Sequence, residues 1–159
     1  MPRHQAIILK KQPLREHDEL IMCYTREQGK QRYIAKSSRL ARSKQGSHLD
    51  VMNYIEFGLV PGRHFDIIAS AQAVDTFPLL KASLTSLANA FFLFECFDKL
   101  VFDGQRDDAL WEFLLQALRT GVVDRPAFMA TLGYHHSTPL ADLNPAYFTS
   151  LRFLATLER

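Results

Sequence analysis

The spacing of apolar residues divides the chain into two regions near Pro78. Before Pro78, short apolar runs alternate with turn residues, and Ile55, Phe57 and Leu59 occupy every second position of one run, as in a half-buried strand. The expected strands are Ala6–Lys10, Leu20–Thr25, Arg32–Lys36, Val51–Val60 and Phe65–Val74. The fifth run also alternates, through Phe65, Ile67, Ala69, Ala71 and Ala73. Five short strands with one long connection between the third and the fourth predict a small closed barrel, and an OB-like barrel is the leading interpretation.

After Pro78 the apolar residues recur at steps of three and four, which predicts helices. These are expected from Leu84 to near Gly104, from Asp107 or Asp108 to Gly121, over Pro126–Leu132, and from Asn144 onward. The sequence therefore predicts an α+β protein, with an OB-fold β-barrel domain over residues 1–78. An α-helical domain is expected over residues 79–159.

Positive charge is concentrated in the first half of the chain. Residues 1–80 hold twelve Lys and Arg against eight Asp and Glu, whereas residues 81–159 hold seven against nine. The densest basic stretch has Glu27 as its only acid and contains Arg26, Lys30, Arg32, Lys36, Arg39, Arg42 and Lys44. Such a stretch attracts polyanions, so the domain over residues 1–78 is expected to bind nucleic acid. The segment Ser37–Gln45 is expected to be a flexible loop.

Aromatic residues beside a basic loop are the means by which OB domains bind single-stranded nucleic acid. Tyr33, with Tyr24 and Tyr54, is the candidate for stacking on bases. Two simpler interpretations stay open: that the tyrosines are half-buried strand residues, and that the charges only protect strand edges from aggregation.

No assembled active site is recognisable in the sequence. Phosphate-loop, nucleophile-elbow and H-E-x-x-H motifs are missing, and Asp107-Asp108 is better explained as a helix cap than as a metal ligand pair. Cys23 and Cys96 are too few for a disulfide framework or a zinc site, and His135-His136 lacks a third ligand. We therefore expect no enzyme activity, no cofactor and no metal.

The sequence also suggests where the protein resides. The most apolar run, Ala90–Phe94, is closed by Glu95 and is too short to cross a bilayer, and the N-terminus lacks the apolar core of a signal peptide. A cytoplasmic protein without membrane contact is expected.

Several segments together resemble the RecO family of bacterial recombination mediators. The most specific is Thr25-Arg26-Glu27-Gln28-Gly29-Lys30 followed by Ala35-Lys36, and weaker ones are Ala6–Lys10, Glu16–Leu20, Phe77–Leu80 and Thr131–Tyr134. Ser37 stands where the family commonly has Gly. The family's zinc module would follow Tyr134, but here Ser137-Thr138-Pro139 leads to the last expected helix, so we expect a shortened member.

The resemblance implies a DNA repair function without turnover of a small molecule. It implies binding of single- and double-stranded DNA and annealing of complementary strands at the bacterial nucleoid. It further implies cooperation with RecR in loading RecA onto DNA coated by the single-strand-binding protein. Two alternatives remain open: a general OB module for RNA or DNA, and a helical adaptor that binds no DNA.

The helical half is the expected contact for the acidic C-terminal tail of the single-strand-binding protein. Phe91, Phe92, Phe94 and Phe97 either line a groove for that peptide or form core. The candidate cations for the tail are Lys81, Lys99, Arg119 and Arg152.

Overall fold

The computed structural model describes residues 2–132. The chain forms two compact units. Within the described residues, the first comprises residues 2–76 together with Phe102–Asp107, and the second comprises Phe77–Val101 and residues 108–132. The sequence pattern predicts a domain boundary between residues 78 and 79. It does not predict that residues 102–107 belong to the first unit.

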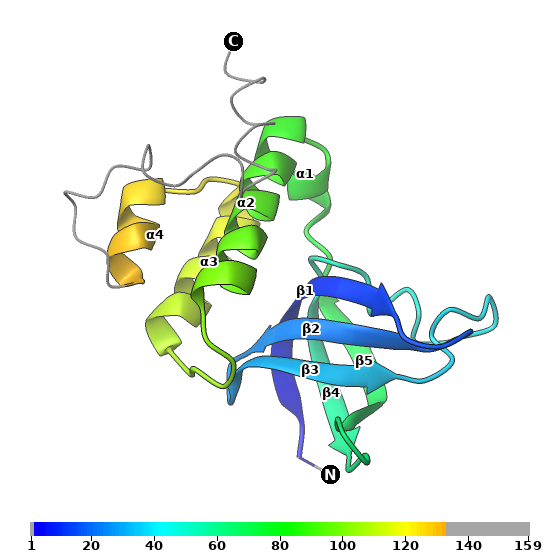
Figure 1. Cartoon of the computed structure of the whole chain (residues 1–159). Coiled ribbons are helices and arrows are strands. Elements are labelled where there is room, and N and C mark those ends of the chain that lie inside the picture. The colour runs from blue at the N-terminus through cyan, green and yellow to red at the C-terminus, as the bar shows by residue number, and fades with distance from the viewer. Residues whose placement is uncertain (1, 133–159) are drawn as a thin grey trace. The chain divides into compact units, whose positions relative to one another are not determined.

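The first unit is a closed five-stranded barrel (Figure 1). Its strands are β1 (His4–Pro13), β2 (Glu19–Thr25), β3 (Gly29–Ala35), β4 (Tyr54–Val60) and β5 (Ile67–Asp75). They follow the order β1-β2-β3-β5-β4, and β4 pairs with β1 to close the barrel. All pairs are antiparallel except β3 with β5, which meet in parallel at Ile34 and Ile67. This topology confirms the predicted OB fold.

Alternate side chains of the strands fill the barrel. The core cluster consists of Ala6, Ile8, Ile21, Cys23, Tyr33, Ala35, Leu49, Ile55, Phe57 and Ile68. Leu49 comes from the connection between β3 and β4 and is fully buried. Because burial of a leucine removes apolar surface from water, this residue fixes the end of that connection to the barrel.

Two predicted strands begin later than expected. β4 starts at Tyr54 instead of Val51, because Met52 has a φ of 80° and turns the chain there. β5 starts at Ile67, and its register with β4 shifts between the pairs Gly58–Ser70 and Leu59–Ile68. Ala69 is therefore an extra residue in the ladder, and the predicted alternation over this part of β5 is wrong because Ile68 is buried and Ala69 is exposed.

The second unit contains α1 (Pro78–Lys81), α2 (Leu84–Leu100), α3 (Asp108–Thr120) and α4 (Arg125–Thr131). Ser83 caps α2 and Asp124 caps α4, each by accepting a backbone N–H with its side chain. As predicted, Gly121 follows α3, and its left-handed φ of 71° suits a glycine. Gly104 does not end α2, which stops at Leu100. The helix expected from Asn144 lies outside the described residues.

Three of the four phenylalanines considered for a groove are core residues. Phe92, Phe94 and Phe97 are buried, and Phe91 is 43% exposed. The ring of Phe97 stacks on that of Phe128 in α4 at 5.8 Å between centroids. The guanidinium of Arg125 lies 5.5 Å from the centroid of Phe92. The helix α2 carries apolar residues on more than one face because α1, α3 and α4 pack against it.

In the part of the chain that the structure describes, no helix is both long and apolar enough to span a membrane.

Candidate nucleic-acid interface

The connection between β3 and β4, residues 36–53, carries the basic loop that the sequence predicts. Its first end is tied to the connection between β1 and β2. The backbone N–H of Ser37 donates to Asp18 Oδ1 at 2.8 Å, and the N–H of Arg39 donates to the carbonyl of His17 at 3.1 Å. The hydroxyl of Ser38, which is buried, donates to Glu19 Oε1 at 2.9 Å. The start of the loop is thus held in place.

The second half of the loop is tied to β5. The side-chain amide of Gln45 donates to the carbonyl of Ala69 at 2.9 Å. The backbone N–H of Ala73 donates to Nδ1 of His48 at 3.1 Å. Together with buried Leu49, these contacts hold the loop against the barrel. The segment Ser37–Gln45, which the sequence predicts to be a flexible loop, thus makes hydrogen bonds to the rest of the barrel unit at both of its ends.

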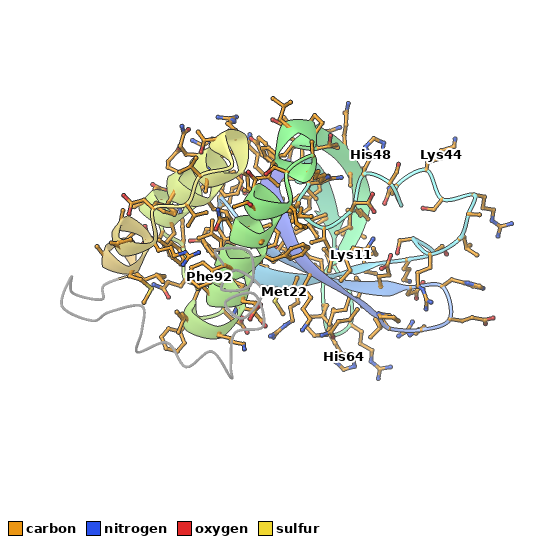
Figure 2. The ribbon with its side chains drawn as sticks, turned by 90° about the horizontal axis from the view of Figure 1, so that it is seen from above. Lys11, Met22, Lys44, His48, His64 and Phe92 are labelled. Atoms are coloured by element: carbon orange, nitrogen blue, oxygen red, sulfur yellow. The ribbon has the colours of Figure 1, made fainter. Side chains whose placement is uncertain are left out.

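The exposed side chains of this loop are strongly basic. Lys36, Arg39, Arg42 and Lys44 are all exposed, and Figure 2 shows Lys44 on the part of the loop that extends away from the strands. Asp50 is the only acid in residues 36–53, and its carboxylate lies 3.7 Å from Lys11 Nζ. The local potential is therefore positive and attracts polyanions.

The predicted basic residues on the strands are placed differently. Arg26 is exposed after β2 and donates to Gln5 Oε1 at 3.3 Å. Lys30 and Arg32, on β3, both face Asp103: Lys30 Nζ lies 3.7 Å from Oδ1, and Arg32 Nη1 lies 3.1 Å from Oδ2. The Lys30 side chain is only 5% exposed. A phosphate could reach these two residues only in competition with the Asp103 carboxylate.

Tyr33 cannot act as a stacking platform, so that expectation is corrected. Its side chain is buried in the barrel, with its ring 5.5 Å from that of Phe57 and its hydroxyl bonded to Gln28. Burial raises the pKa of Tyr33 above its ordinary value. Tyr24 and Tyr54 are buried as well. All three tyrosines are therefore buried, and no face of the Tyr33 ring is open to a base.

An aromatic residue that sequence reasoning missed lies in the connection between β4 and β5, residues 61–66. Phe65 is 37% exposed there, beside exposed Arg63 and His64. His64 projects from the outside of the barrel (Figure 2). This connection is one of the two loops with which OB folds commonly bind oligonucleotides. The signal in the sequence was an aromatic residue and two basic residues directly after the turn residues Pro61-Gly62.

The cations considered for an acidic peptide lie on separate helices. Lys81, Lys99 and Arg119 are exposed on α1, α2 and α3, and Lys99 Nζ lies 4.0 Å from Glu95 Oε2. Arg152 lies outside the described residues, as do His135 and His136.

Chemistry that depends on metals or thiols gains no support from residues 2–132. Within this range no three potential metal ligands of the His, Cys, Asp or Glu type lie together. Cys23 and Cys96 are buried, and burial raises the pKa of Cys96 to about 12, so both are protonated core residues at neutral pH.

Comparison with known proteins gives a consistent result. Residues 1–77 match the family described as "Recombination protein O N terminal". The chain is similar to the DNA repair protein RecO of Desulforudis audaxviator, with 31% identity over 121 residues, covering 76% of this chain and 49% of that protein. Similarity to RecO of Cutibacterium acnes is 32% over 129 residues, 78% of this chain and 52% of that protein. RecO of Acaryochloris marina is 34% identical over 113 residues, which cover 71% of this chain and 39% of that protein. The chain thus spans about half the length, or less, of these relatives.

Proposed function

The chain belongs to the family of recombination protein O through its residues 1–77, and from this premise we propose that it acts in bacterial DNA repair by binding DNA with its OB barrel. The observation that carries the proposal is the group of four exposed cations, Lys36, Arg39, Arg42 and Lys44, on a loop anchored to the barrel. The relatives that share this region bear the name DNA repair protein RecO.

The proposed contact is electrostatic and tolerant of sequence. Flexible lysine and arginine side chains on an anchored backbone contact phosphates, which are common to all sequences and to single- and double-stranded DNA. Phe65 adds an exposed ring for an unpaired base. Binding that neutralises phosphates on two complementary strands lowers their mutual repulsion, and this is the physical basis for annealing.

Further parts of the proposal concern partners. We assign to the protein cooperation with RecR in loading RecA onto DNA coated by the single-strand-binding protein, at the nucleoid in the cytoplasm. The acidic tail of the single-strand-binding protein would contact Lys81, Lys99 and Arg119 in the helical unit, and Arg152 beyond the described residues. Exposed cations on this unit support the tail contact by charge complementarity. The role is one of binding and not of catalysis.

An annealing assay with two charge-reversal variants tests the proposal. The loop variant carries Arg39→Glu, Arg42→Glu and Lys44→Glu, and the helix variant carries Lys81→Glu, Lys99→Glu and Arg119→Glu. Both change the net charge equally, and all six positions are exposed. On bare strands, the wild type and the helix variant should accelerate annealing and the loop variant should not. Equal acceleration by the loop variant would overturn the assignment of the DNA contact.

The same assay on strands coated by the single-strand-binding protein tests the tail contact. The helix variant should then anneal more slowly than the wild type, because its tail contact is lost. If the helix variant performs as well as the wild type on coated strands, these three cations do not contact the tail.

A further inference from the structure

A hollow of about 120 Å³ lies on the outside of the barrel between β3 and the β4–β5 connection. It is lined by Lys30, Gln31, Arg32, Phe65 and Asp103. Tyr33 on β3 belongs to the barrel core. Because successive side chains of a strand point to opposite faces, Lys30 and Arg32 lie on the outer face. A closed cavity of about 150 Å³ holds one benzene ring. An open hollow of similar size therefore has room for one flat ring.

The acidic wall of the hollow comes from the segment Phe102–Asp107, which belongs to the barrel unit. The N–H of Gly104 donates to the carbonyl of Lys30 at 2.9 Å, and Asp103 forms a β-bridge with Lys30. Gly29, with a φ of 71°, lets this segment approach closely, because a Cβ at this position would collide with the backbone of Gln105. The backbone of Asp103 is thus held beside Lys30 on β3.

The Asp103 carboxylate occupies the place that an anion would take beside Arg32. It lies 3.1 Å from Arg32 Nη1, while its side chain is 60% exposed and that of Arg32 is 38% exposed. An ion pair as exposed as this one contributes little to stability. Arginine can bind a phosphate with two parallel hydrogen bonds, so a phosphodiester can compete for this guanidinium.

We propose that this hollow binds one unpaired nucleotide of DNA, with its base against Phe65 and its phosphate on Arg32, and that Asp103 competes with the phosphate for Arg32. The proposal rests on the proposed function and adds a defined subsite to it. Bases in a duplex are stacked on each other and cannot lie flat on Phe65, so this subsite favours single strands over duplex. Asp103 keeps that affinity lower than the two cations alone would give.

Substitution of Asp103 tests the competition. Asp103→Asn should tighten binding of a fluorescent dT oligonucleotide about three- to tenfold, because no displaced carboxylate then takes up a cation and offsets the contact between the phosphate and Arg32. The slope of log K against log salt should become more negative by about 0.7. Glu112→Gln is the matched control, because it also removes one exposed carboxylate, and Glu112 lies on α3, outside the residues proposed to contact DNA. It should change the affinity less than twofold. Equal effects of the two substitutions would overturn the competition.

A tryptophan at position 65 tests the base contact. Trp111 is the only tryptophan of the sequence and is buried, so it gives a constant background in the wild type. In Phe65→Trp, saturating dT oligonucleotide should quench the added fluorescence, whereas duplex DNA should quench it much less. Phe65→Leu should weaken single-strand binding severalfold more than duplex binding.

The outcomes separate this proposal from the proposed function. If anisotropy shows that DNA binds and that the loop variant abolishes the binding, but the tryptophan is not quenched and Asp103→Asn has the same affinity as Glu112→Gln, the subsite is wrong and the basic loop stands. If the wild-type protein does not bind DNA at low salt, both the subsite and the proposed function are wrong.

Discussion

The backbone N–H of Asp107 donates a hydrogen bond of 3.1 Å to the hydroxyl of Tyr24, although 83 positions separate the two residues in the chain. The same hydroxyl lies 3.2 Å from the carbonyl oxygen of Gln105 and 3.3 Å from that of Asp107, and it donates its hydrogen toward them. Tyr24 is fully buried. This phenol therefore holds the segment Phe102–Asp107 on the barrel.

Replacement of Tyr24 by Phe should destabilise the protein. The variant keeps the ring but leaves the N–H of Asp107 and the nearby carbonyls without this partner, which costs about 1–3 kcal/mol for part-buried groups. Urea unfolding measures the loss. Tyr33→Phe is the control, because its hydroxyl makes a single 3.3 Å bond to the side chain of Gln28, which is exposed. A Tyr24→Phe variant as stable as Tyr33→Phe would show that the hydroxyl does not hold the segment.

Replacement of Ser37 by Gly should stabilise the protein. Ser37 has a φ of 56°, a left-handed conformation that costs a residue with a Cβ about 1 kcal/mol and costs glycine little. The gain should be about 0.5–1 kcal/mol in urea unfolding, without loss of the bond from the Ser37 N–H to Asp18.

Ser47→Gly is the comparison for that variant. Ser47 is also exposed in the same loop, but it is not among the non-glycine residues of positive φ. Glycine there should lower stability by a few tenths to 1 kcal/mol through added freedom of the unfolded chain. A loss in both variants would contradict the left-handed assignment of Ser37.

Alkaline pH should reveal the burial of Cys96. Burial raises its pKa from 9.0 to about 12, so between these values the unfolded chain releases a proton that the folded chain keeps. The contribution of the protonated Cys96 thiol to stability is therefore fully present below pH 9. It falls as the pH rises toward 12, by up to about 1.4 kcal/mol per pH unit. The difference in unfolding free energy between wild type and Cys96→Ala should shrink from pH 8 to pH 10.5. A difference independent of pH would mean that the thiol ionises in the folded protein.

The barrel could be predicted because its strands carry local signals. Ile55 and Phe57 alternate with polar or small residues, and Pro61-Gly62 marks a turn. The register of β5 could not be predicted, because the extra residue Ala69 is defined only by its pairing with Gly58 and Leu59 on β4. A bulge is a property of two strands, and a pattern along one strand does not contain it.

The basic loop could be predicted from charge alone, because Arg39, Arg42 and Lys44 have few acidic neighbours in sequence. The state of Arg32 could not, because its partner Asp103 lies 71 positions away. Tyr33 was misjudged for a related reason. A strand pattern shows that residues alternate, but only the neighbouring strands decide that the tyrosine ring faces inward.

Equilibrium binding of single-stranded DNA as a function of salt tests the central claim most directly, namely that the β3–β4 loop is the electrostatic contact. For the wild type, neutralisation of four to six phosphates gives a slope of log K against log salt of roughly −3 to −4. The loop variant with Arg39→Glu, Arg42→Glu and Lys44→Glu should lose most of its affinity, and its slope should flatten by about 2. Its unfolding free energy should change little, because exposed charges contribute little to stability. The helix variant should keep the wild-type slope. A folded loop variant with wild-type affinity and slope would contradict the account.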